Sequence, residues 1–259
     1  MKSAASFVLL FAFALSGVAS QHYLAYSRSK IVGGTPADDA EYPSQVSLRA
    51  LGSHSCGATI ISESWILTAA HCVQGLLPSF LAVHAGSNHL ITNGTTHDVI
   101  RFIKHPGFNF SDFASEDIAV AEVYPPFVFS EAAQPVQLPA QDAETPAGSA
   151  AVVVGWGFVD VNGPVSPSLL EVDQIVRSYQ ECYDIYSVDV PITQAQICAD
   201  VPEGGKGVCS GDSGGPLYVD GQIVGIVSWS ANGCAAQGFP GVFTRVASYR
   251  DWITENTGV

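Results

Sequence analysis

Short apolar runs, each bounded by Gly, Pro, Asn or Asp, recur from residue 31 to about residue 244. The clearest of them occupy residues 45–48, 65–67, 117–123, 150–154 and 222–229. Frequent short runs with turn-forming residues between them are typical of antiparallel strands in a sandwich or a barrel. The sequence therefore predicts an all-β protein.

Helical signals are few and lie in the second half of the chain. Ser178 and Glu181 have the spacing of a capping box, which predicts a short helix after them. Residues 248–256 carry apolar side chains at i, i+3 and i+4, which suits a terminal amphipathic helix. Residues 135–148 are rich in Pro and show no strand pattern, so we expect the boundary between two halves there.

The composition excludes several classes of protein. Of the 259 residues 47% are hydrophobic, which is ample for a packed core and excludes disorder. The formal net charge of −14 argues against nucleic acid as a partner, because Lys and Arg must neutralise phosphate. The longest apolar run, residues 7–15, falls short of the roughly 18 residues of a spanning helix, so no membrane partner is expected.

The N-terminal segment reads as a secretory signal. Lys2 precedes the apolar run, and small residues follow it at 17–20, so residues 1–20 are predicted to be a signal peptide of a secreted, extracellular protein. In an oxidising compartment the six Cys are expected to form disulfides, with 15 pairings open. No zinc-binding spacing occurs. The sequons at Asn93 and Asn109 are compatible with glycosylation.

Charge changes abruptly at residue 30. Residues 1–30 contain no acid, so the remaining chain holds all 24 acids against seven Lys and Arg, a formal charge of −17. The stretch before this break, residues 26–30, ends in Lys30 and is expected to be exposed and open to cleavage after a basic residue.

One hexapeptide carries most of the chemical information. Ser213 lies within residues 211–216, among three Gly and a Pro, where the backbone can turn tightly beside a ligand. The segment reads either as a plain turn between strands or as a nucleophile, which needs a base. His71, in the apolar segment 67–72, is a candidate base or a buried core histidine, and Asp117 opens an apolar run where it could orient an imidazole.

Three further segments, Ile-Val-Gly-Gly at 31–34, Gly-Trp-Gly at 155–157 and Ser-Trp at 228–229, accompany these motifs. Taken together, they resemble the secreted trypsin-like serine proteases of the chymotrypsin fold, from residue 31 to the C-terminus. The resemblance implies two antiparallel six-stranded β-barrels with the active site between them and a C-terminal helix. It implies a protease domain at 31–259, with halves of about 31–140 and 141–245 and a helix at about 246–259. The residues that carry it are 31–34, 68–72, 117–119, 155–157, 211–216 and 228–229.

The resemblance also assigns roles. Ser213 is the implied nucleophile, His71 the general base and then acid, and Asp117 the residue that orients His71. The backbone N–H groups of Gly211 and Ser213 form the implied oxyanion hole. No metal and no cofactor are required.

Zymogen activation is implied as well. Residues 21–30 would be a propeptide, and cleavage after Lys30 by a trypsin-like protease would free the amino group of Ile31 to pair with Asp212. The implied disulfides are Cys56–Cys72, Cys182–Cys198 and Cys209–Cys234. Protein or peptide substrates, the activating protease and protein inhibitors are the expected partners of a monomer.

The implied specificity pocket has Gly207 at its base, where cleavage after Lys or Arg would need a carboxylate. Its other residues are Ser228, Trp229 and Ser230 on one wall and Gly241 on the other. An open, uncharged pocket predicts a chymotrypsin-like preference for large apolar or aromatic residues. Four alternatives remain: an elastase-like preference for smaller residues because of Ser230, acidic substrates drawn by Lys206, a regulatory protease with one target, and a catalytically inactive binding protein.

Overall fold

The structure, a computed structural model, describes residues 32–109, 115–159, 163–186 and 190–259. The predicted signal peptide, the propeptide and Ile31 lie outside the described residues. Among the described residues, no helix is long and apolar enough to span a bilayer.

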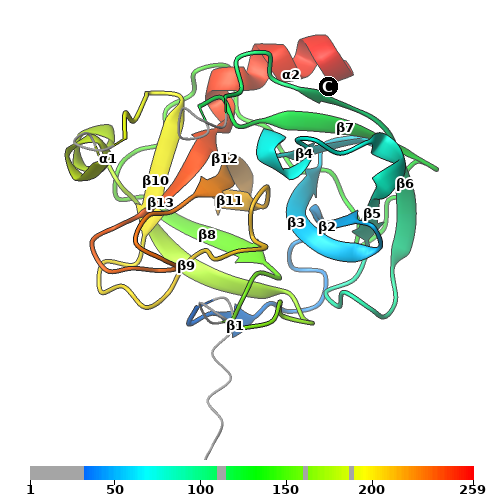
Figure 1. The fold of residues 1–259 in the computed structure, drawn as a ribbon, viewed down its shortest axis with the longest axis horizontal. Helices are drawn as coiled ribbons and strands as arrows, with labels where there is room; N and C mark the ends of the chain where they lie inside the picture. Colours follow the sequence, from blue (N-terminus) through cyan, green and yellow to red (C-terminus); the bar gives the residue numbers. More distant parts are fainter. Residues whose placement is uncertain (1–31, 110–114, 160–162, 187–189) are drawn as a thin grey trace, which may run out of the picture.

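The first half of the chain closes into a six-stranded antiparallel barrel, with its strands in the order β2-β3-β4-β7-β6-β5 (Figure 1). Most of its strands are followed within two residues by Gly, Ser or Pro, which allow the chain to turn. They are β2 (Gln45–Ala50), β3 (Ser53–Ile60), β4 (Trp65–Thr68), β5 (Leu81–Ala85), β6 (Thr95–Lys104) and β7 (Ala119–Tyr124).

The second half forms a sheet in the order β1-β9-β10-β13-β12-β11-β8, and pairing of β8 with β9 closes six of these strands into a second barrel. The short β1 (Thr35–Pro36) adds to β9. The prediction of two six-stranded antiparallel barrels is therefore confirmed. The barrel strands are β8 (Ala150–Gly155), β9 (Leu170–Val176), β10 (Gln196–Asp200), β11 (Pro216–Val219), β12 (Gln222–Trp229) and β13 (Gly241–Arg245).

Two α-helices and three short 3-10 helices complete the described chain. α1 (Tyr179–Tyr186) begins at the predicted capping box, where Ser178 Oγ accepts from Glu181 N at 3.2 Å and Ser178 N donates to the Glu181 carboxylate at 2.9 Å. α2 (Arg250–Thr257) is the expected C-terminal helix and lies beside β7 of the first barrel (Figure 1). The 3-10 helices are Ala70–Cys72, Pro78–Phe80 and Val246–Tyr249.

Contacts between the barrels fix the site. From β13, Thr244 Oγ1 donates to the backbone oxygen of Asp117 at 2.8 Å, just before β7. From β3, Gly57 N donates to the backbone oxygen of Ser213 at 2.8 Å. These buried bonds cross between the two halves, so the residues on either side of the junction are held in a defined register.

Candidate active site

The Asp117 carboxylate lies at the junction of the barrels, fully buried, and holds the His71 ring. Its Oδ2 accepts from His71 Nδ1 at 2.6 Å, and its Oδ1 accepts from His71 N at 2.9 Å. Ser228 Oγ donates to the same Oδ2 at 2.6 Å. With the proton on Nδ1 directed at Asp117, the Nε2 of His71 is left as the basic nitrogen.

Local structure presents the His71 ring to solvent while its backbone stays fixed. His71 is the middle residue of the 3-10 turn Ala70–Cys72, after Ala69 and Ala70, which are both fully buried. The next residue, Cys72, is bonded to Cys56 on β3 with an S–S distance of 2.05 Å. The His71 side chain itself is 20% exposed, so a substrate can reach it.

Ser213 reaches the same junction from the second barrel, in the turn before β11. Gly214 allows this approach: its φ is +79°, and a Cβ there would lie 2.2 Å from Thr68 Oγ1, in the segment that leads to His71. Among the described residues Ser213 Oγ makes no hydrogen bond, to His71 or to any other group. Catalytic serine–histidine contacts commonly tighten only when substrate binds.

Two backbone donors beside Ser213 have no acceptor. In the part of the chain that the structure describes, neither Gly211 N nor Ser213 N donates a hydrogen bond, whereas Gly214 N and Gly215 N both do. Gly211 has a φ of +93°, a left-handed conformation that a residue with a side chain would adopt only under strain. Free N–H groups on both sides of a fixed residue suit the binding of an oxyanion.

That fixed residue is Asp212, which is fully buried. Its carboxylate accepts from Gly157 N at 2.7 Å and from Cys209 N at 2.9 Å. Burial raises its pKa to about 7, against the opposing effect of the two backbone donors. A Cβ on Gly155 or Gly157 would lie 2.2 or 2.3 Å from this carboxylate, which explains the Gly-Trp-Gly motif. Its expected partner, the Ile31 amino group, lies outside the described residues.

Sequence reasoning missed His54, which supports Gly211. Its Nε2 lies 3.0 Å from Gly211 O, and its Nδ1 lies 2.8 Å from Ser47 Oγ. Burial lowers the pKa of His54 to about 4, so the ring is neutral at physiological pH and Nε2–H donates while Nδ1 accepts. A signal was available, because His54 lies two residues before the Cys56 that tethers His71.

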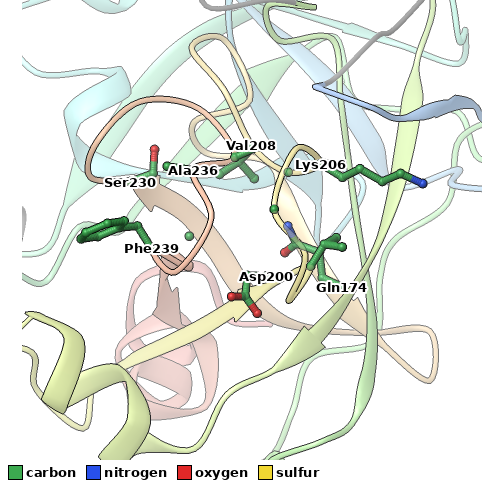
Figure 2. Close-up of a pocket in the computed structure, with 12 residues that line it drawn as sticks. Gln174, Asp200, Lys206, Val208, Ser230, Ala236 and Phe239 are labelled. Atoms are coloured by element: carbon green, nitrogen blue, oxygen red, sulfur yellow. The ribbon is translucent and has the colours of Figure 1, made fainter.

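A pocket lies beside this centre in the second barrel (Figure 2). Three of the five expected pocket residues line it, namely Gly207, Ser230 and Gly241. Ser228 and Trp229 do not, since the Ser228 hydroxyl is bonded to Asp117 and the Trp229 ring packs edge-on to Tyr186 at 5.0 Å. Sequence reasoning missed several other lining residues, which include Gln174, Asp200, Val208, Ala235, Ala236 and Phe239.

The pocket differs from the expected one in size and lining. Its enclosed space is about 10 Å³, room for about one water, where an open and deep pocket was expected. The charged group Asp200 lines it, but Arg177 Nε donates to Asp200 Oδ1 at 2.6 Å and balances its charge. Lys206 is exposed, and its ammonium points away from the other labelled residues in Figure 2.

All six cysteines form disulfides, in the three pairs that the resemblance implies: Cys56–Cys72, Cys182–Cys198 and Cys209–Cys234. Cys56, His71 and Cys72 lie close enough together to suggest a metal site. The sulfurs of Cys56 and Cys72 are bonded to each other, so neither cysteine offers a thiolate to a metal. The side chains of Asn93 and Asn109, the two sequon residues, are both exposed.

A serine, a histidine and a buried aspartate at the junction of two antiparallel barrels define a serine protease of the double-barrel class. Comparison with known proteins agrees: the Trypsin family model matches residues 31–253. The chain belongs to the trypsin family.

Curated relatives match most of the chain. A vitellin-degrading protease from Bombyx mori is 38% identical over 88% of this chain and 85% of its own length. A trypsin from Phaedon cochleariae is 37% identical over 89% of each protein. Trypsin 5G1 from Aedes aegypti is 39% identical over 90% of this chain and 87% of its own length.

Proposed function

We propose that the chain is a secreted serine endopeptidase, made as a zymogen, that hydrolyses peptide bonds through an acyl-enzyme. The observation that carries the proposal is the pairing of His71 Nδ1 with buried Asp117 at 2.6 Å, beside Ser213 and beside the N–H groups of Gly211 and Ser213, which have no acceptor among the described residues. This arrangement supplies a base, a nucleophile and an oxyanion site at one place.

The proposed chemistry follows from these positions. His71 Nε2 takes the proton of Ser213 Oγ as the oxygen attacks the scissile carbonyl, and the N–H groups of Gly211 and Ser213 stabilise the oxyanion. His71 then gives the proton to the leaving amine, and Asp117 stabilises the protonated ring meanwhile. His71 then takes a proton from water as the water attacks the acyl carbonyl, and it returns that proton to Ser213 Oγ as the bond to the acyl group breaks. This template is drawn from the same family, so the steps are carried over from it.

We propose that residues 1–20 direct secretion and that cleavage after Lys30 activates the enzyme. Asp212 supports the second step, because a buried carboxylate with two backbone donors and a pKa raised to about 7 is better stabilised once a cation pairs with it. The Ile31 amino group is that proposed cation. A trypsin-like activator, protein inhibitors, a monomeric state and glycosylation at exposed Asn93 and Asn109 complete the proposal.

For substrate preference we propose a large apolar or aromatic residue before the scissile bond. Gly207 and Gly241 place no side chain in the pocket, and neither provides the carboxylate that cleavage after Lys or Arg needs. The narrow enclosed space of about 10 Å³ favours the second candidate, a preference for smaller apolar residues. A large side chain would have to displace the pocket walls.

Labelling and peptide cleavage test the proposal. After trypsin treatment of the precursor and removal of the trypsin, a fluorescent phosphonate should label the enzyme but not its Ser213→Ala variant. Peptides with Phe or Leu before the scissile bond should be cleaved faster than a matched Arg peptide. Absence of labelling would mean an inactive binding protein, and faster cleavage of the Arg peptide would overturn the preference.

A further inference from the structure

Gln174 is an unexpected polar side chain inside the second barrel. It lies on β9, where alternate residues point inward, and its inward neighbours Leu170, Val172 and Val176 are apolar and at most 3% exposed. Gln174 is itself only 3% exposed. Such an inward position would normally hold another apolar residue.

The carboxamide oxygen of Gln174 lacks a hydrogen-bond donor in the described part of the chain. Its Oε1 is buried and accepts no hydrogen bond from the described residues. A buried acceptor without a donor is costly, so a group that persists in this state commonly has a role. Since the two ends of a carboxamide can exchange by a flip, either its oxygen or its NH₂ can face the same space.

The carboxamide faces the base of the specificity pocket. Gln174 lines that pocket, and its Nε2 lies 3.3 Å from the place that a Cβ would take on Gly207. Figure 2 shows its amide among the labelled pocket residues, between Asp200 and Lys206. Because Gly207 has no side chain, it leaves the Gln174 amide accessible from the pocket.

The charged groups near the Gln174 carboxamide are not available to bind a substrate side chain at the base of the pocket. Asp200 is engaged by Arg177 at 2.6 Å, and Lys206 points away. The Phe239 ring, which also lines the pocket, packs against the Tyr186 ring with 6.4 Å between the ring centres. The polar group left at the base is therefore an uncharged donor and acceptor.

We propose that Gln174 is a specificity-determining residue, which selects a substrate side chain that ends in a neutral hydrogen-bonding group, either a phenol or a carboxamide. This rests on the proposed function and refines it, because the pocket would prefer Tyr or Gln to an apolar side chain of the same size. A site built to bond a polar tip rejects the analogue that lacks it, since the buried polar group is then left unpaired.

Two matched substrate pairs test the proposal on the activated enzyme. The first compares peptides with Tyr and 4-methylphenylalanine before the scissile bond, and the second compares Gln and Met. Each pair keeps size and removes the hydrogen-bonding tip. We expect kcat/KM to favour the polar member by about tenfold in the first pair if the phenol is the ligand, or in the second if the carboxamide is.

Gln174→Leu removes the bonding atoms at similar volume. The ratio should fall to about one in this variant, and its Tm should stay the same or rise, because an unpaired buried oxygen is lost. Gln180→Leu is the matched control: Gln180 is exposed on α1, bonds Asp184 at 2.7 Å, and should leave both ratios unchanged. The substrate ratios of the unmodified enzyme remain decisive if Gln174→Leu does not fold.

Failure of this inference can be told from failure of the proposed function. Ratios near one in both pairs, with Phe and Leu peptides still cleaved, would overturn the role of Gln174 alone. A ratio that persists in Gln174→Leu would overturn it too. Loss of phosphonate labelling at Ser213, or preferred cleavage of the Arg peptide, would instead overturn the proposed function.

Discussion

Two buried aspartates differ in what surrounds them. Asp117 receives three donors, two from His71 and one from Ser228, and one of them becomes a cation when His71 takes a proton. The described residues offer Asp212 only two backbone donors. Asp117 thus has a potential cation, the His71 ring, already bonded to it. Asp212 has no cationic partner among the described residues.

At Asp117 the prediction concerns Ser228→Ala. Short bonds from a hydroxyl to a carboxylate are charge-assisted, and losing this one should misorient Asp117 and lower kcat about tenfold with little change in KM. Steady-state kinetics of the activated variant on a peptide substrate would measure it.

Thr244→Val is the matched control for Ser228→Ala. Thr244 bonds the backbone oxygen of Asp117 at 2.8 Å and not its carboxylate, so this variant should lower the Tm while kcat stays within about twofold. An equal fall in kcat for both variants would show that the contact between the barrels matters, and not the bond to the carboxylate.

At the scale of the elements, some strands were predicted from the sequence more accurately than others. The run at 222–229, which is apolar except for Gln222 and Ser228, coincides with β12, and the run at 150–154 lies within β8. The run at 117–123 was expected to be a strand from its first residue, but β7 begins only at Ala119. Asp117 lies before the strand, outside any regular element, where its side chain meets His71. β9 was missed because Glu171 and Asp173 alternate with its apolar residues.

In the candidate site too, some residues could be predicted from the sequence and others could not. His71, Asp117 and Ser213 stand in local motifs and could be found from the sequence. The position of His54 near Cys56 gave a hint of its location, but the roles of His54 and Gln174 could not be found, because they come from contacts across the fold. His54 bonds Gly211, 157 residues away, and Gln174 on β9 faces Gly207 in the loop between β10 and β11. Contacts of this kind depend on barrel closure, which no local pattern encodes.

α1 provides a prediction at the scale of one element. Ser178→Ala removes the acceptor of Glu181 N and the donor to the Glu181 carboxylate, whose bonds lower the pKa of that residue. The loss should destabilise the protein by about 1 kcal/mol. Urea unfolding and amide exchange of the helix would measure it.

Gln180→Ala, on the same helix, serves as the comparison for Ser178→Ala. It removes only an exposed bond to Asp184 and introduces a better helix former, so stability should hardly change. If both variants were equally destabilised, the cap would not be the cause.

At the scale of the whole molecule, the charge break at Lys30 and the buried Asp212 are both expected to take part in activation by cleavage. The body of −17 includes a carboxylate that the described residues leave without an ion pair, and cleavage at the break would create one cation, the Ile31 amino group. The free energy of that pair is expected to separate the precursor from the active enzyme, and so to make their difference in stability depend on pH.

The sign of this dependence follows from two pKa values. Burial raises the pKa of Asp212 from 3.8 to about 7 in the unpaired form, so the folded precursor binds an extra proton between these values and loses stability as pH rises through that window. In the cleaved form the Ile31 amino group, with an unfolded pKa of about 8, keeps Asp212 ionised and has its own pKa raised. Its contribution is present below about pH 8 and is lost as pH rises through the folded value.

We therefore expect the unfolding free energy of the cleaved form, minus that of the precursor, to grow from pH 4 to pH 7 and to fall again at alkaline pH. Urea titrations of both forms on a Ser213→Ala background, which prevents self-digestion, would measure the difference. Groups common to both forms, His54 among them, cancel. Asp212→Asn cannot ionise and should flatten the curve. A difference independent of pH would refute the pairing of Ile31 with Asp212. A pH dependence that persists in Asp212→Asn would refute it too, because it would come from another group that the two forms do not share, such as His22 of residues 21–30.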